Sequence, residues 1–194
     1  KELAVYPTLN RVMLRSMQKA RYASENLGHF GLASDCYCHF TSPIRRYPDL
    51  CIHRIIKDVL NGHYGHACDV YGGFVEEAAA QSSDKERRAT EAEREVDALY
   101  ATMYMSERID EEYDAVISGV TSFGLFAELP NAIEGFIPIE SLYGQFEFIP
   151  ERFLLKGNRE SYSLGEKIRV SVADVDFEKR RTIFKFLGKI ISED

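Results

Sequence analysis

The pattern of apolar residues changes once along this chain of 194 residues, near Asp110, and that change constrains the fold more than any other feature. Before it, apolar residues recur at helical spacing, and after it short segments alternate apolar and polar residues between turn residues. The expected strands are Glu112–Val120, Leu125–Leu129, Gly135–Ile139, Lys167–Asp174 and Thr182–Leu187. Five strands within fewer than 80 residues predict a small closed barrel, which is typical of an OB fold.

The expected fold class is therefore α+β, with a mainly helical part over residues 1–110, an all-β barrel over residues 111–189 and a tail over residues 190–194. Tyr143–Leu164 is expected to be a long connection that Phe146, Phe148 and Phe153 attach to the barrel.

Four helices are expected in the first part of the chain, with a loop over residues 22–45 between the first two. They cover residues 8–20, residues from Pro48 to Asn61-Gly62, about Asp69 to Ala80, and Ser83 to Arg108. Pro48 suits a first helical turn, and Ser83-Asp84-Lys85-Glu86 has the pattern of a capping box that opens a new helix.

Composition narrows the functional classes. Hydrophobic residues make up 45% of the chain, enough for a packed core, and no apolar run approaches the roughly 20 residues that span a bilayer. The net charge is −7, with 14 Lys and Arg against 16 Asp and Glu in residues 1–110 and 10 against 15 in residues 111–194. Contacts with a nucleic acid must therefore come from local clusters such as Arg45-Arg46 and Lys179-Arg180-Arg181.

The four cysteines lack the paired C-x-x-C spacing of a zinc site. Cys36-x-Cys38-His39 is the one suggestive cluster, but reduced thiols of a cytoplasmic protein are the favoured interpretation, and no metal site is expected in this chain.

The segment His39–Asp49 predicts a phosphate site. Arg45 and Arg46 follow a Ser-Pro turn and precede a helix start, where free N–H groups add to the charge of the guanidinium groups. Arg46 either contacts phosphate or secures the loop by pairing with Asp49, and Ser42 either donates to phosphate or forms the turn. His39 is either a ligand or a packing residue.

Gly119–Ala127 has the pattern of a nucleic-acid-binding face of a small barrel, with Phe123 and Phe126 on either side of a glycine. Exposed aromatic rings there stack on bases, although one of them can instead fill the end of the barrel.

The first part of the chain resembles the end of the catalytic (RNB) domain of the ribonuclease II / ribonuclease R family. The residues that carry the resemblance are Met17–Tyr22, Asn26–Ala33, Tyr37, His39–Asp49, His53-Arg54 and Arg87-Arg88-Ala89. The second part is similar to the RNA-binding OB domain named after the first protein of the small ribosomal subunit, and the two parts together match the ribonuclease R arrangement.

The resemblance implies a processive, Mg²⁺-dependent exoribonuclease that degrades single-stranded RNA from 3′ to 5′ and releases nucleoside monophosphates. It implies that Arg45 binds charge on the phosphate in the transition state, and that Phe136 and Arg181 contact RNA together with Phe123 and Phe126. The clustered aspartates that hold the metal ions in such enzymes have no counterpart here.

The chain is therefore expected to be a C-terminal fragment that binds RNA without hydrolysing it and lacks its N-terminal partner segment, with self-association of the fragment as a further expectation. The alternatives are a noncatalytic RNA-binding module and a translation-associated scaffold. An aspartate cluster upstream of this chain would decide for the exoribonuclease and against the module.

Overall fold

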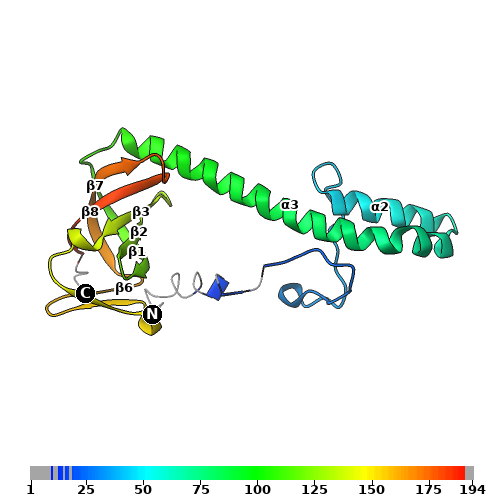
Figure 1. The fold of residues 1–194 in the computed structure, drawn as a ribbon, viewed down its shortest axis with the longest axis horizontal. Helices are drawn as coiled ribbons and strands as arrows, with labels where there is room; N and C mark the ends of the chain where they lie inside the picture. The colour runs from blue at the N-terminus through cyan, green and yellow to red at the C-terminus, as the bar shows by residue number, and fades with distance from the viewer. Residues whose placement is uncertain (1–9, 11–12, 15, 18, 191–194) are drawn as a thin grey trace. The chain divides into compact units, whose positions relative to one another are not determined.

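The computed structural model describes residues 10, 13–14, 16–17 and 19–190. The chain divides into two compact units: a helical unit over residues 18–92, and a barrel unit over residues 93–194 that also includes the residues before position 18. Helix α3, Tyr64–Ser106, runs from the first into the second (Figure 1). The helix expected over residues 8–20 and the tail after residue 190 lie largely outside the described residues.

The helical unit is built on two helices joined by a short turn, α2 over Tyr47–Leu60 and the first half of α3, which lie side by side (Figure 1). Pro48 stands in the first turn of α2, and the helix ends at Asn61 as predicted. Tyr71 of α3 donates a hydrogen bond of 3.0 Å to Asp58 of α2, which ties the two helices together.

The predicted separation between a helix ending near Ala80 and another starting at Ser83 is wrong, because α3 is continuous. The Ser83 hydroxyl donates to the carbonyl of Ala79, 2.9 Å away, and accepts the N–H of Tyr22 at 3.0 Å. Ser83 therefore lies inside the helix, and its side chain holds the loop at Tyr22. A capping box does not form here, because its first residue must be non-helical.

The barrel unit contains the five predicted strands, which close in the order β1-β2-β3-β8-β7. Their bounds are β1 Glu112–Thr121, β2 Gly124–Glu128, β3 Glu134–Pro138, β7 Lys167–Asp176 and β8 Arg181–Lys189. All neighbouring pairs are antiparallel except β3 and β8, which run parallel and complete the closure. The predicted α+β fold class and OB-like barrel are confirmed.

The interior of the barrel is filled from alternate positions of each strand, as the pleat requires. The completely buried side chains include Ile117, Leu125, Ile137, Ile168, Val170, Val172 and Phe184. Met105, the last residue but one of α3, is also fully buried in this core. Gly135 is needed in β3 because a Cβ there would stand 2.3 Å from the ring of Phe184.

The segment 143–164 is a small antiparallel sheet, so the prediction of a plain connection is wrong. Its strands are β4 Phe146–Ile149, β5 Leu154–Gly157 and β6 Ser161–Ser163. Phe146 and Phe148 pack against the barrel core as predicted, whereas Phe153 is 45% exposed and does not hold the segment. The short 3₁₀ turns Phe30–Leu32 (η1), Ile139–Ser141 (η2) and Pro150–Arg152 (η3) complete the described elements.

Within the described part of the chain, no helix combines the length and the apolar character needed to cross a membrane.

Candidate nucleic-acid interface

The outer face of β2, β3 and β8 carries three of the four residues predicted to contact RNA in the barrel, Phe126, Phe136 and Arg181. Leu125 and Ala127 of β2 point inward, so Phe126 between them points outward, and Phe136 of β3 is its direct cross-strand partner. Arg181 opens β8, and the next residue, Thr182, points into the core. The closure of the barrel thereby brings together side chains from three strands that the sequence places far apart.

These side chains form one continuous group, which we call the aromatic patch: Phe123, Phe126, Phe136 and Arg181. The ring centroids of Phe126 and Phe136 are 5.3 Å apart, and those of Phe123 and Phe136 are 5.8 Å apart. The Arg181 guanidinium carbon lies 5.5 Å from the Phe126 centroid and 5.3 Å from the Phe136 centroid. A guanidinium at this distance from ring faces interacts with their π electrons and still presents N–H donors.

Phe123 owes its exposure to the turn between β1 and β2. The Thr121 hydroxyl donates to the carbonyl of Gly124, 2.8 Å away, and Gly124 has φ of +153°, a conformation that favours glycine. A Cβ at Gly124 would stand 2.2 Å from the carbonyl oxygen of Ile137. The turn is thus closely packed on β3, and it leaves the ring of Phe123 55% exposed.

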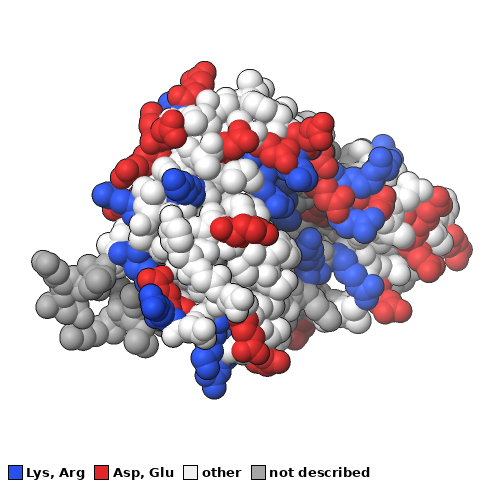
Figure 2. All heavy atoms as spheres, turned by 60° about the vertical axis from the view of Figure 1, so that its left-hand side comes forward, with Lys and Arg blue, Asp and Glu red and all other residues white. Residues whose placement is uncertain are grey.

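Charge around the barrel is mixed. Figure 2 shows Lys and Arg side chains in small groups among Asp and Glu, without a continuous basic surface. On this face, a contact with a polyanion would depend on such small groups.

A groove beside the aromatic patch was not predicted. It has a volume of about 380 Å³ and lies between the last turns of α3 and the strands β3 and β8. Phe126 and Arg181 line it as well as the patch, together with Asp97 and Thr102 of α3 and Glu134 of β3. Sequence patterns do not indicate which strand a helix packs against, so no signal in the chain pointed to this groove.

The loop before α2 is organised around Asp49. This carboxylate is fully buried and accepts hydrogen bonds from the Ser42 N–H at 2.7 Å and from the Arg46 guanidinium at 2.8 Å. Burial by itself raises the pKa of Asp49, but these hydrogen bonds outweigh it, together with the charge of Arg46, and the pKa lies below its ordinary value.

Of the two roles expected for Arg46, the structure shows the pairing with Asp49 that secures the loop. Arg45, by contrast, is exposed. The carbonyl of Ser42 accepts the backbone N–H groups of both arginines, at 3.3 Å and 3.0 Å, so Ser42 forms the expected turn. The structure thus separates two adjacent arginines into one that holds the loop and one whose side chain is turned to the surface.

His39 is placed by aromatic neighbours. Its Nδ1 is hydrogen-bonded to the Tyr22 hydroxyl at 2.8 Å, and its ring stands edge-on to those of Tyr22 and Tyr37. Burial and the nearby Glu86 raise the pKa of Tyr22, so its hydroxyl stays protonated. His53 is hydrogen-bonded to the backbone instead, with its Nε2 2.8 Å from the carbonyl oxygen of Phe40.

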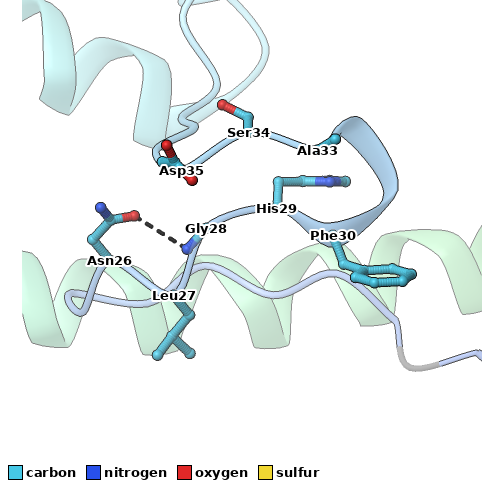
Figure 3. A pocket seen from close by; sticks show the side chains of 8 residues that line it. All are labelled: Asn26, Leu27, Gly28, His29, Phe30, Ala33, Ser34 and Asp35. Atoms are coloured by element: carbon cyan, nitrogen blue, oxygen red, sulfur yellow. Dashed lines mark hydrogen bonds between the residues drawn. The ribbon is translucent and has the colours of Figure 1, made fainter.

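An open cavity of about 690 Å³ is formed by the hairpin loop between Asn26 and Asp35 (Figure 3). The Asn26 side chain accepts the N–H of Gly28, and Nδ1 of His29 accepts the N–H of Leu32 at 3.2 Å. Gly28 has φ of +67°, and a Cβ there would meet the carbonyl of Ser34 at 3.0 Å. The polar groups of this loop are mainly engaged in building the turn itself.

The residues described contain no cluster of metal-ligating side chains. Within them, no three His, Cys, Asp or Glu side chains gather closely enough to hold a metal ion. The four cysteines are free thiols, three of them exposed.

Two family models match the chain: the RNB domain over residues 1–62 and the S1 RNA binding domain over residues 107–186. Among curated relatives, ribonuclease R 1 of Lactococcus lactis subsp. lactis is 43% identical over 92% of this chain, and ribonuclease R of Escherichia coli is 38% identical over 93%. The chain spans 22% and 24% of the lengths of these relatives.

The solved structures agree with this. RNase R of Mycoplasma genitalium in its apo form is 31% identical and covers 94% of this chain with a TM-score of 0.87, and the match takes up 29% of that protein. The same values hold for the structure of that protein in complex with ribose methylated single-stranded RNA.

Proposed function

Because this chain belongs to the ribonuclease R family, which it matches over about a quarter of its relatives' length, we propose that it is the RNA-contacting part of a hydrolytic 3′-to-5′ exoribonuclease. The substrate is single-stranded RNA and the products are nucleoside monophosphates, released in the cytoplasm. The observation that carries the proposal is the aromatic patch, because three aromatic rings and a guanidinium converge on the surface of the barrel that matches the S1 RNA binding domain.

The aromatic patch binds the strand through its bases. Every base has a π face, so stacking on Phe123, Phe126 and Phe136 holds a single strand with little regard to sequence, at about 1–3 kcal/mol per base. Arg181, held over two of the rings, adds a cation that reaches the adjacent phosphate. A base paired in a duplex does not offer its face, so the patch favours single strands.

The loop at the start of α2 binds phosphate near the scissile bond. Arg46, fixed on the buried Asp49, sets the course of the loop, and Arg45 is left to stabilise charge that develops on the phosphate. Ser42 and His39 lie on the same loop and complete the contact with the strand.

Mg²⁺ is the metal of the proposed enzyme, in which it would activate the attacking water. The described residues do not bring together the carboxylates that such an ion requires. In this proposal the metal ligands and the remaining RNA channel belong to the rest of a ribonuclease R-type protein.

A noncatalytic RNA-binding module is the second candidate, because the S1 RNA binding domain model matches residues 107–186 and the aromatic patch lies within them. An aspartate cluster in the sequence upstream of this chain supports the exoribonuclease, and a continuous coding sequence without such a cluster supports the module.

The test of RNA binding is a titration of the 194-residue chain with a labelled unstructured RNA at fixed salt. Phe123→Ala removes the most exposed ring of the aromatic patch and is expected to weaken binding by about 5- to 150-fold, the loss of one stacked base.

Phe153→Ala is the matched control, because Phe153 is also exposed but lies outside the aromatic patch, between η3 and β5. This variant is expected to bind as the unmodified chain does. Absence of binding by the unmodified chain at low salt, or equal losses in the two variants, contradicts the proposed function.

A further inference from the structure

The groove beside the aromatic patch has the volume of a small-ligand site and a mixed lining of small, charged and aromatic residues. Its volume of about 380 Å³ falls in the range of small-ligand sites, about 300–1,000 Å³. On the α3 side the groove is lined by small residues, Ala98, Ala101 and Thr102, which leave room for a ligand. The Thr102 hydroxyl donates a hydrogen bond to the carbonyl of Ala98, 2.8 Å away.

The groove continues the aromatic patch. Phe126 and Arg181 line both, so a strand stacked on the patch has its next nucleotide at the mouth of the groove.

Three consecutive cations border the groove at the turn from β7 to β8: Lys179, Arg180 and Arg181. Lys179 is paired with Asp176 at 3.3 Å, and Arg180 with Glu95 of α3 at 2.6 Å. The side chain of Arg180 is 40% exposed and that of Glu95 is 64% exposed. An ion pair so open to water contributes little to stability. Arg180 can therefore leave Glu95 for a group that binds it more strongly.

The carboxylates of the groove fix the orientation of a ligand. Asp97 lies on α3, and Glu134 of β3 accepts the hydroxyl of Ser118 at 2.6 Å. Their negative charge repels a phosphate, while their oxygens accept hydrogen bonds from hydroxyl or amino groups. A nucleotide therefore fits with its phosphate toward Lys179 and Arg180 and its ribose or base toward the carboxylates.

We propose that the groove is a second RNA subsite, which takes one nucleotide of the strand that stacks on the aromatic patch, and that Arg180 leaves Glu95 to bind its phosphate. This inference rests on the proposed function, because it requires that the patch binds single-stranded RNA. Glu95 then competes with the RNA for Arg180 and sets the affinity of the subsite.

The test compares variants of the 194-residue chain in titrations with an unstructured RNA at several salt concentrations. Arg180→Gln removes one phosphate contact, so affinity is expected to fall and the slope of log K against log salt concentration is expected to flatten by about 0.7. Glu95→Gln removes the competitor, so affinity at low salt is expected to rise by up to about fivefold, the strength of an exposed pair. The double variant is expected to show no gain over Arg180→Gln.

Arg169→Gln is the matched control for charge. Arg169 is an exposed arginine paired with Asp114 at 3.0 Å, and in the β7–β8 ladder it is opposite Gly188, at the end away from Arg181. Its loss removes the same charge without touching the groove, so the salt slope is expected to stay unchanged.

The outcomes separate the two proposals. Failure of the unmodified chain to bind RNA removes the proposed function and this inference with it. Binding that Phe123→Ala weakens, but that Arg180→Gln and Glu95→Gln leave unchanged in affinity and salt slope, keeps the RNA-binding barrel and overturns the subsite. A loss of affinity in Glu95→Gln also overturns it, because Glu95 would then assist binding.

Discussion

At the scale of single residues, Asp49 decides how the loop before α2 is built. Its Oδ2 accepts both the Ser42 N–H and the Arg46 guanidinium, so one buried oxygen joins the turn to the helix start. An aspartate at the third position of a helix also interacts favourably with the helix N-terminus. The two arginines differ in role because only Arg46 reaches this carboxylate.

The pH dependence of the loop follows from the lowered pKa of Asp49. A carboxyl group whose pKa is lower in the folded than in the unfolded state contributes stability above its ordinary pKa of 3.8, and that contribution is lost as the pH falls through the folded value. The amide signal of Ser42, followed by NMR during acid titration, is expected to shift with a midpoint below 3.8. In Asp49→Asn this transition is expected to be absent. A midpoint at or above 3.8 would show that burial of the carboxylate dominates over its hydrogen bonds.

At the scale of elements, the sheet β4–β6 is attached to the barrel through Tyr162. The ring is 1% exposed and lies 5.6 Å from that of Phe146 and 5.2 Å from that of Phe186. Its hydroxyl donates to Glu160 at 2.6 Å, and burial together with this carboxylate raises the pKa of Tyr162, so the donor stays protonated. The ring thus connects β6 with β4 and with β8 of the barrel.

Tyr162→Ala is expected to destabilise the barrel unit by about 3–5 kcal/mol, since it leaves a cavity of aromatic size in the core. Tyr162→Phe keeps the ring and is expected to cost about 1 kcal/mol, the contribution of one hydrogen bond. Urea unfolding followed by circular dichroism measures both. Similar losses in the two variants would mean that the hydrogen bond to Glu160, and not the packing of the ring, attaches the sheet.

Helix α3 shows how a local signal can be overridden at this scale. Ser83-Asp84-Lys85-Glu86 satisfies the capping pattern, yet Ser83 lies in the helix interior. Its hydroxyl bonds the Ala79 carbonyl within the helix and the Tyr22 backbone outside it, so its hydrogen-bonding capacity is used without ending the helix.

At the scale of the whole molecule, the chain combines two units, and residues proposed to contact RNA lie in both. The helical unit presents Arg45, the barrel unit presents the aromatic patch, and the described residues of both lack a cluster able to hold a metal. Binding and hydrolysis should therefore separate in this chain.

The chain is expected to bind single-stranded RNA equally well with and without Mg²⁺, and to release no nucleoside monophosphates. A degradation assay on 5′-labelled RNA measures this, with Arg45→Ala as the control for contaminating nucleases. Mg²⁺-dependent shortening from the 3′ end that Arg45→Ala abolishes would show that a metal site exists in this chain.

The sequence by itself determined the elements whose signals are local. The five barrel strands follow from period-two alternation, and α2 follows from Pro48 and Asn61. The pairing of Arg46 with Asp49 was one of two alternatives that the sequence left open, and the structure shows it. Phe123 and Phe126 were chosen from their positions on either side of a glycine at a strand turn, and Phe136 and Arg181 were chosen by resemblance.

Only the tertiary structure decided what depends on contacts between distant segments. The convergence of the aromatic patch needs the parallel pairing of β3 with β8, and the groove needs α3 to pack beside that pair. Within α3, Ser83 likewise bonds a partner far along the chain, the backbone of Tyr22. The strands β4 to β6 pair with their neighbours in sequence, but Tyr162 attaches them to the barrel by packing on the distant Phe186. Local propensities contribute less free energy than one such set of packing contacts, so tertiary packing overrides them. The sequence does not indicate which distant segments will make these contacts.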